Sequence, residues 1–166
     1  MSMAKNKNER KIKMEKVRGF EIAKGWEDKA INLPIRKTKY SAGYDVEAAE
    51  DVVVPSFKKG MAPTLVKTGI KAYMQDDEVL MLYNRSSNPK KKGLILANSV
   101  GVVDKDYYGN SDNDGHIMFA FYNIKDEDTV IKKGDAIGQA IFQKYLVSDD
   151  DNAEGERMGG FGSTSK

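Results

Sequence analysis

The chain has 166 residues, of which 40% are apolar and 31% charged, and its net charge is +2. This length suits one domain with a substantial core, and the composition excludes a disordered, collagen-like or membrane-spanning chain. With no cysteine and a single histidine, His116, the sequence excludes disulfide scaffolds, thiolate zinc sites and cysteine nucleophiles, and it disfavours histidine charge-relay catalysis. Any chemistry therefore depends on carboxylates, hydroxyls, amides and cations.

The charge is unevenly distributed along the chain. Residues 1–40 contain 12 Lys and Arg against 5 Asp and Glu, whereas residues 41–166 contain 15 against 20. The start of the chain lacks the apolar stretch of a secretory signal, which predicts a cytoplasmic protein with a flexible basic extension over residues 1–16. Such an extension could neutralise phosphates, but it is short, has no interleaved aromatic residues and precedes an acidic body. A solvated terminus is the preferred interpretation, and nucleic acid is not an expected partner.

Short apolar, β-branched or aromatic runs, separated by Gly, Asn and Asp turn residues, predict strands. They lie at residues 52–54, 65–73, 79–83, 94–96, 100–103, 117–122 and 136–146. No long window has apolar residues at helical spacing, although a helical turn near residues 86–92 is compatible with Pro89. The pattern predicts an all-β sandwich or barrel.

The end of the chain has too little apolar surface to fold alone. Residues 148–156 are acidic and residues 159–164 are rich in glycine, so we expect residues 148–166 to be a mobile tail. Two interpretations stay open: an ordinary frayed terminus, or a segment that orders over a ligand with Phe161 stacked on a flat ring.

Two short segments are candidates for phosphate and water chemistry. Arg85, Ser86 and Ser87 precede a run of lysines and offer the hydroxyls and cations that bind a polyphosphate, although a solvated surface loop fits them as well. Asp104 ends the apolar run 100–103, and a carboxylate at a strand end is held well enough to orient a water molecule.

Five segments in this order resemble the five motifs of the trimeric dUTPase family. The resemblance spans residues 17–164, and it is carried by Ala42-Gly43-Tyr44-Asp45, Arg85-Ser86-Ser87, residues 98–109, Gly134-Asp135-Ala136-Ile137-Gly138-Gln139, and Arg157 with residues 160–164. It implies a jelly-roll-like, distorted β-barrel over residues 17–147 that forms a homotrimer. It also implies active sites at subunit interfaces, each closed by the tail of a neighbouring subunit.

The implied reaction is the hydrolysis of dUTP to dUMP and pyrophosphate, which limits dUTP and supplies dUMP. Mg²⁺ is implied as a cofactor held by the triphosphate and water, with no direct protein ligand and Asp45 near its water shell. The implied catalytic residues are Asp104, which activates the attacking water, and Gln139. The implied substrate-binding residues are Arg85, Ser86 and Ser87 for phosphate, Asn98, Gly101 and Val103 for uracil, Tyr107 for deoxyribose, and Arg157, Phe161, Gly162 and Ser163 in the tail.

Three departures from the family pattern are visible. Ser87 stands where the family commonly has glycine, the spacing between Arg157 and Phe161 is one residue short, and residues 110–116 look like an insertion that lengthens a hairpin. We expect the acids of this insertion to be solvated. A dCTP deaminase-like relative and a dUTP-gated regulatory module on the same fold are the alternatives, so a regulatory protein partner stays open. The source is expected to be a bacterium or a phage.

Overall fold

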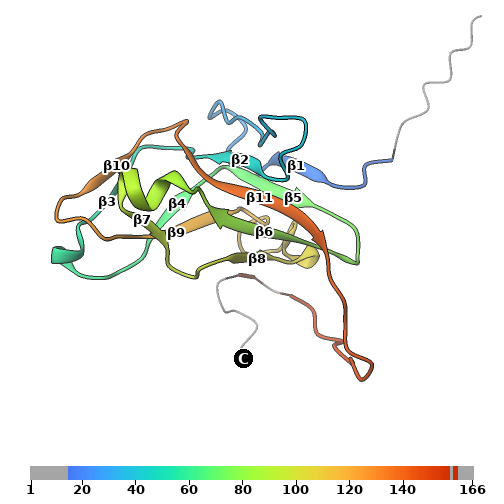
Figure 1. Cartoon of the computed structure of the whole chain (residues 1–166). Coiled ribbons are helices and arrows are strands. Elements are labelled where there is room, and N and C mark those ends of the chain that lie inside the picture. The colour runs from blue at the N-terminus through green and yellow to red at the C-terminus, as the bar shows by residue number, and fades with distance from the viewer. Residues whose placement is uncertain (1–14, 158, 161–166) are drawn as a thin grey trace, which may run out of the picture.

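The computed structural model describes residues 15–157 and 159–160 (Figure 1). Eleven strands account for nearly all of its regular structure. They are β1 (Gly19–Ile22), β2 (Tyr44–Glu47), β3 (Val52–Val54), β4 (Thr64–Lys67), β5 (Ile70–Tyr73), β6 (Glu78–Asn84), β7 (Leu94–Leu96), β8 (Gly101–Val103), β9 (Met118–Asn123), β10 (Thr129–Ile131) and β11 (Ala136–Lys144). The helical segments are single turns: η1 (Phe57–Lys59), η2 (Asn88–Lys92) and η3 (Lys105–Tyr107). The prediction of an all-β fold is confirmed.

The strands form four antiparallel sheets. The largest has the order β2-β11-β6-β8, and a second has the order β4-β9-β7. Two further pairs, β1-β5 and β10-β3, complete the fold. Among the described residues, none of the helical segments is long and apolar enough to cross a membrane.

The two larger sheets pack face to face around an apolar core. Residues of β9 alternate between buried and partly exposed, and the buried Phe119 and Phe121 point into this core. Gly138 of β11 makes room for Phe119, because a Cβ atom there would overlap Cε1 of its ring. The absence of a side chain at residue 138 therefore sets how closely β11 packs against β9.

The observed strands differ from the predicted ones in a few places. The run 65–73 is divided into β4 and β5, because the chain turns at Thr68 and Gly69, where Gly69 has a φ of +70°. Strands β1, β2 and β10 were not predicted, since each is short and carries polar or charged residues. The helical turn expected near residues 86–92 is η2.

The chain leaves the barrel after β11. In Figure 1 the segment beyond Lys144 runs away from the sheet and then returns beneath β8. Residues 145–156 are exposed, whereas Arg157 and Gly159 are not. This return brings the C-terminal segment to the end of β8.

Candidate active site

A cavity of about 360 Å³ opens beside β8 and η3. Its walls include residues of β8, the turn before this strand, the start of β9 and the returning C-terminal segment. Six of the sequence-predicted site residues line it: Asn98, Gly101, Val103, Asp104, Tyr107 and Arg157. Residues that lie far apart in the sequence, from 98 to 157, therefore meet around one cavity of small-molecule size.

All three residues of strand β8 line this cavity. It pairs with β6, so that Gly101 lies opposite Leu82 and Val103 opposite Leu80. A Cβ atom at residue 101 would lie 3.0 Å from side-chain atoms of Leu82, so glycine lets the two strands pack closely here. The turn before β8 contains the exposed Asn98, and residue 99 has a φ of +61°.

Asp104 follows β8 directly and precedes η3. Its backbone is extended, and its side chain makes no capping hydrogen bond to η3, although it occupies the N-cap position. Half of the side chain is exposed. The carboxylate is therefore fixed in position by the strand and still accessible from the cavity.

Arg157 is held by two carboxylates. Its Nη2 donates to Oδ2 of Asp104, and its Nε donates to Oδ1 of Asp106 over 2.6 Å. The guanidinium is 19% exposed, less than either carboxylate. Charge-assisted hydrogen bonds of this kind are stronger than neutral ones, so they place a cation at the cavity without a ligand.

Tyr107 closes the cavity on its buried side. Its hydroxyl donates to the carbonyl oxygen of His116 over 2.9 Å and accepts from Nδ2 of Asn113 over 2.8 Å. Burial raises the pKa of this hydroxyl above its ordinary value, so the group stays protonated. Gly160 lies against the ring, where a Cβ atom would come within 2.6 Å of Cε2.

The expected phosphate-binding residues occupy a second group of positions. Gln139 lies in β11, opposite Asp45 of β2, and its side chain packs against Gly43. Arg85 follows β6 and donates from Nη1 to the carbonyl oxygen of Ala136 over 3.3 Å. Ser86 and Ser87 follow Arg85 and precede η2. These described residues are not part of the lining of the 360 Å³ cavity of this chain.

The serine found where the family commonly has glycine is accommodated without strain. Ser87 has a φ of −81° and a ψ of −19°, which is the right-handed helical region that any residue adopts. A glycine is therefore not required at this position by the backbone.

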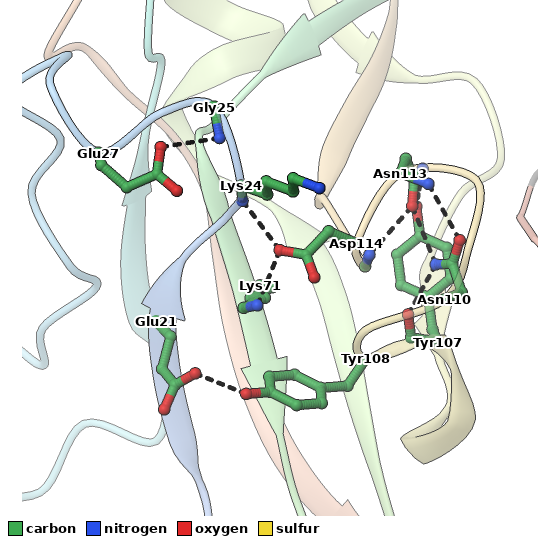
Figure 2. A network of polar contacts seen from close by, with 11 residues as sticks. Glu21, Lys24, Gly25, Glu27, Lys71, Tyr107, Tyr108, Asn110, Asn113 and Asp114 are labelled. Carbon is green, nitrogen blue, oxygen red and sulfur yellow. Dashed lines mark hydrogen bonds and ion pairs between the residues drawn. The ribbon is translucent and has the colours of Figure 1, made fainter.

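The loop 110–116 corrects two predictions (Figure 2). It does not lengthen a hairpin, because β8 pairs with β6 while β9 pairs with β4 and β7. Its acids are not all solvated either, since Oδ2 of Asp114 accepts from Nζ of Lys71 over 2.7 Å and from the backbone N–H of Lys24 over 2.8 Å. Sequence reasoning missed this anchoring because Asp114 is one of many acids in the chain.

His116, the single histidine, is a structural residue of this loop. Its Nε2 accepts a hydrogen bond from the backbone N–H of Gly69 over 2.9 Å, and its ring packs on Trp26. Burial lowers its pKa from 6.5 to about 4, because the charged imidazolium would lose its hydration. The ring is therefore neutral at physiological pH.

Some predicted features lie outside the described residues: Phe161, Gly162 and Ser163, and residues 1–14 of the expected extension. Within residues 15–157 and 159–160, no three His, Cys, Asp or Glu side chains are grouped so that they could hold a metal ion.

The fold and the site together define a nearly all-β protein with a small-molecule cavity. Aromatic, carboxylate and guanidinium groups in one cavity suit a ligand with a ring and an anionic part. The comparisons with known proteins narrow this class.

The dUTPase family model matches residues 29–165 of the chain. The deoxyuridine 5'-triphosphate nucleotidohydrolase of Lactococcus lactis subsp. lactis (strain IL1403) is 55% identical over 151 residues, covering 90% of this chain and 98% of the relative. The crystal structure of dUTPase from Streptococcus mutans has a TM-score of 0.73 and 46% identity, and covers 79% of this chain and 98% of that chain. The chain therefore belongs to the dUTPase family, the enzymes that hydrolyse dUTP.

A more distant structure has the same fold. A mutant dUTPase from phage phi11 of S. aureus, which coordinates a structural Mg(II) ion, has a TM-score of 0.63. It is 17% identical and covers 84% of this chain and 98% of that chain. At this identity the likeness concerns the fold alone.

Proposed function

We propose that the cavity beside β8 is the place where this chain hydrolyses dUTP, and that Asp104 activates the attacking water. One observation carries the proposal: six residues expected at the site, five from residues 98–107 and one from the C-terminal segment, line a single cavity. Asp104 is accessible from that cavity and follows a strand that fixes its position.

In the proposed reaction Asp104 takes one proton from the water as the water oxygen bonds to the α-phosphorus. The bond from the α-phosphorus to the bridging oxygen breaks, and pyrophosphate leaves with the electron pair. Arg157, next to Asp104, provides positive charge for the oxygens on which negative charge develops. The products are dUMP and pyrophosphate, which accounts for all the atoms of dUTP and water.

The uracil and the sugar are assigned to the part of the cavity between β8 and Tyr107. The side chain of Asn98 and the backbone at Gly101 and Val103 offer hydrogen-bonding groups at the edge of a flat ring. Tyr107 is assigned to the deoxyribose, where its buried ring leaves no room for a 2′-hydroxyl.

The triphosphate is assigned to Arg85, Ser86, Ser87 and Gln139. Because these residues do not line the cavity of their own chain, we propose that they serve the cavity of another copy in a homotrimer. Each active site would then combine the β8 side of one copy with the β6 and β11 side of a second. The family resemblance implies closure by the tail of a neighbouring subunit, whereas Arg157 and Gly160 here line the cavity of their own chain. The tail beyond Arg157, with Phe161, Gly162 and Ser163, is assigned to closure over this composite site.

The residues present fit a magnesium ion that is bound mainly through the substrate. Mg²⁺ keeps several waters and is commonly bound through substrate phosphates, and Asp45, opposite Gln139 in the sheet, is the carboxylate assigned to the neighbourhood of its water shell. When bound, the ion supplies positive charge at the triphosphate. The protein side chains named above account for base recognition, water activation and charge at the cavity.

Hydrolysis is preferred to the two alternatives. The matched relative and the matched solved structure are named as dUTP hydrolases, which favours this activity over a dCTP deaminase. A regulatory role on the same fold would require binding of dUTP without turnover. A cytoplasmic location in a bacterium or in a phage-infected bacterium is the setting we propose.

The experiment is pyrophosphate release from the purified protein with Mg²⁺ and one of four nucleotides: dUTP, dTTP, dCTP or UTP. We expect release from dUTP alone, since the slot assigned to uracil and the ring of Tyr107 act as separate filters for base and sugar. Binding of dUTP without pyrophosphate release would contradict hydrolysis and favour the regulatory alternative.

A further inference from the structure

Two asparagines of the loop after η3 hold Tyr107 from both ends (Figure 2). Nδ2 of Asn110 donates to the backbone carbonyl of Tyr107 over 2.7 Å. Nδ2 of Asn113 donates to the Tyr107 hydroxyl over 2.8 Å. The same residue that lines the cavity is therefore fixed at its backbone and at the far end of its ring.

The amide of Asn113 has its orientation set by other contacts. Its Oδ1 accepts from Nδ2 of Asn110 over 2.9 Å and from the backbone N–H of Gly115 over 3.1 Å. With the oxygen occupied on that side, the NH₂ group is directed at Tyr107. The tyrosine hydroxyl then gives its own hydrogen to the carbonyl oxygen of His116 over 2.9 Å.

In this arrangement the Tyr107 hydroxyl already donates one hydrogen bond and accepts another within the protein. A ribose hydroxyl brought against Tyr107 would lose hydration and find the tyrosine hydrogen already bound to His116. A ring held by two hydrogen bonds also cannot move aside without breaking them. Both effects disfavour a ribonucleotide and leave a deoxyribonucleotide unaffected.

The loop that carries Asn113 is itself tied to the barrel. Asp114 is bound to Lys71 of β5 and to the backbone of Lys24, over 2.7 and 2.8 Å. His116 is bound to the backbone of Gly69 between β4 and β5. The position of Asn113 is thus set by strands outside the cavity.

We propose that Asn113 is a positioning residue for sugar discrimination, which acts by fixing Tyr107. The proposal rests on the proposed function, in which Tyr107 meets the deoxyribose. It makes the loop 110–116 a determinant of specificity rather than a neutral insertion.

The test compares the affinities for dUDP and UDP by calorimetry with Mg²⁺, so that the readout does not depend on turnover. The variants are Asn113→Ala, Tyr107→Phe and the double variant. We expect Asn113→Ala to reduce the preference for dUDP over UDP by about 3- to 10-fold, the worth of one hydrogen bond. In the Tyr107→Phe background the same change should alter the preference less than about twofold, because the contact is already lost.

The matched control is Asp112→Ala in the same loop, where the backbone N–H rather than the side chain bonds to Asn110. We expect it to keep the wild-type preference. If Asn113→Ala does not fold, Asn113→Ser replaces it, since its hydroxyl can still accept from the backbone N–H of Gly115 but is too short to reach the Tyr107 hydroxyl.

The hydrolysis of dUTP and the role of Asn113 can fail independently in these experiments. A wild-type protein that prefers dUDP to UDP but releases no pyrophosphate from dUTP would overturn the proposed hydrolysis and leave the role of Asn113 open to the same binding test. An unchanged preference in Asn113→Ala, or an equal loss in the Tyr107→Phe background, would overturn the role assigned to Asn113.

Discussion

An ion pair joins Arg157 of the C-terminal segment to Asp104 at the end of β8. A second contact joins Nε of the same arginine to Asp106 over 2.6 Å. The carboxylate assigned to water activation and a cation suited to phosphate are therefore already together in the free chain. On binding, the arginine can share its charge between Asp104 and the phosphate oxygens.

This contact predicts a catalytic loss without a large loss of stability when Arg157 is changed to alanine. We expect kcat to fall about 100-fold, because a donor to the developing negative charge is removed. The melting temperature should change little, because both carboxylates are about half exposed and regain water. Steady-state kinetics and thermal unfolding measure the two effects, with Arg157→Lys as a variant that keeps the charge but not the planar fork. An unchanged kcat in Arg157→Ala would contradict the role assigned to this residue.

The contact between Gly160 and Tyr107 predicts a second loss of activity. A Cβ atom at residue 160 would lie 2.6 Å from the ring, so Gly160→Ala must move either the ring or the segment that carries residue 160. We expect KM for dUTP to rise several-fold with little change in stability. Gly155→Ala is the matched control, since nothing lies within 4 Å of its added carbon. Equal KM values for the two variants would show that the C-terminal segment does not sit against Tyr107.

Arg18 forms an ion pair with the buried carboxylate of Glu78 at the start of β6. Glu78 is 4% exposed, accepts three hydrogen bonds from Arg18, and has a pKa below 4.5 chiefly because of them. Arg18→Ala would leave this carboxylate buried beside one backbone N–H, and we expect a loss of about 2–3 kcal/mol in the free energy of unfolding at pH 7.

The sign of the pH effect follows from the lowered pKa of Glu78. The contribution of the pair is present above about 4.5 and is lost as the pH falls through the folded-state value. The difference in the free energy of unfolding between wild type and Arg18→Ala should therefore decrease as the pH falls below about 4.5. Lys16→Ala, which breaks an exposed pair with Glu21, should cost much less than Arg18→Ala, because solvent screens an exposed ion pair. Urea unfolding at several pH values measures both, and equal losses for the two variants would contradict this account.

The buried, neutral His116 should make the stability of the fold sensitive to acid. Because burial lowers its pKa from 6.5 to about 4, the unfolded chain binds a proton there at higher pH than the folded chain does. The stability linked to neutral His116 is complete above about pH 6.5 and decreases as the pH falls toward 4, by roughly 3 kcal/mol in total.

The measurement compares wild type with His116→Gln, whose side-chain oxygen can still accept from Gly69. The carboxylates titrate alike in both proteins, so the difference between their free energies of unfolding isolates the histidine. We expect this difference to fall between pH 7 and 4. A constant difference over that range would show that His116 is not buried in a neutral form.

The sequence predicted the fold class and the strands with the most apolar residues. Val52–Val54 and Leu94–Leu96 are β-strands with the predicted bounds, because continuous β-branched or aliphatic residues favour a strand. Strands such as Gly19–Ile22 are partly exposed along their whole length and carry charge, which hides them among loop residues. Local composition also could not divide residues 65–73, since the turn depends on the left-handed backbone of Gly69.

The candidate site was predictable in its residues and less so in its arrangement. Asp104, Tyr107 and Arg157 were expected at one site and line one cavity, whereas Arg85 and Gln139 lie outside the cavity of their own chain. Asn110 and Asn113 were missed, because their role depends on contacts that cross the loop. The signal for them is a pair of asparagines three residues apart, the first of them three residues after Tyr107, followed by Asp114 and Gly115, which both have positive φ.

The central claim is that Asp104 activates the water that attacks dUTP. The most direct test measures pyrophosphate release by Asp104→Asn, together with the affinity of the variant for dUDP, since asparagine keeps the shape of the side chain but is not a base. We expect kcat to fall at least about 100-fold while the affinity stays within a few-fold of wild type. Hydrolysis by Asp104→Asn at nearly the wild-type rate would contradict the claim.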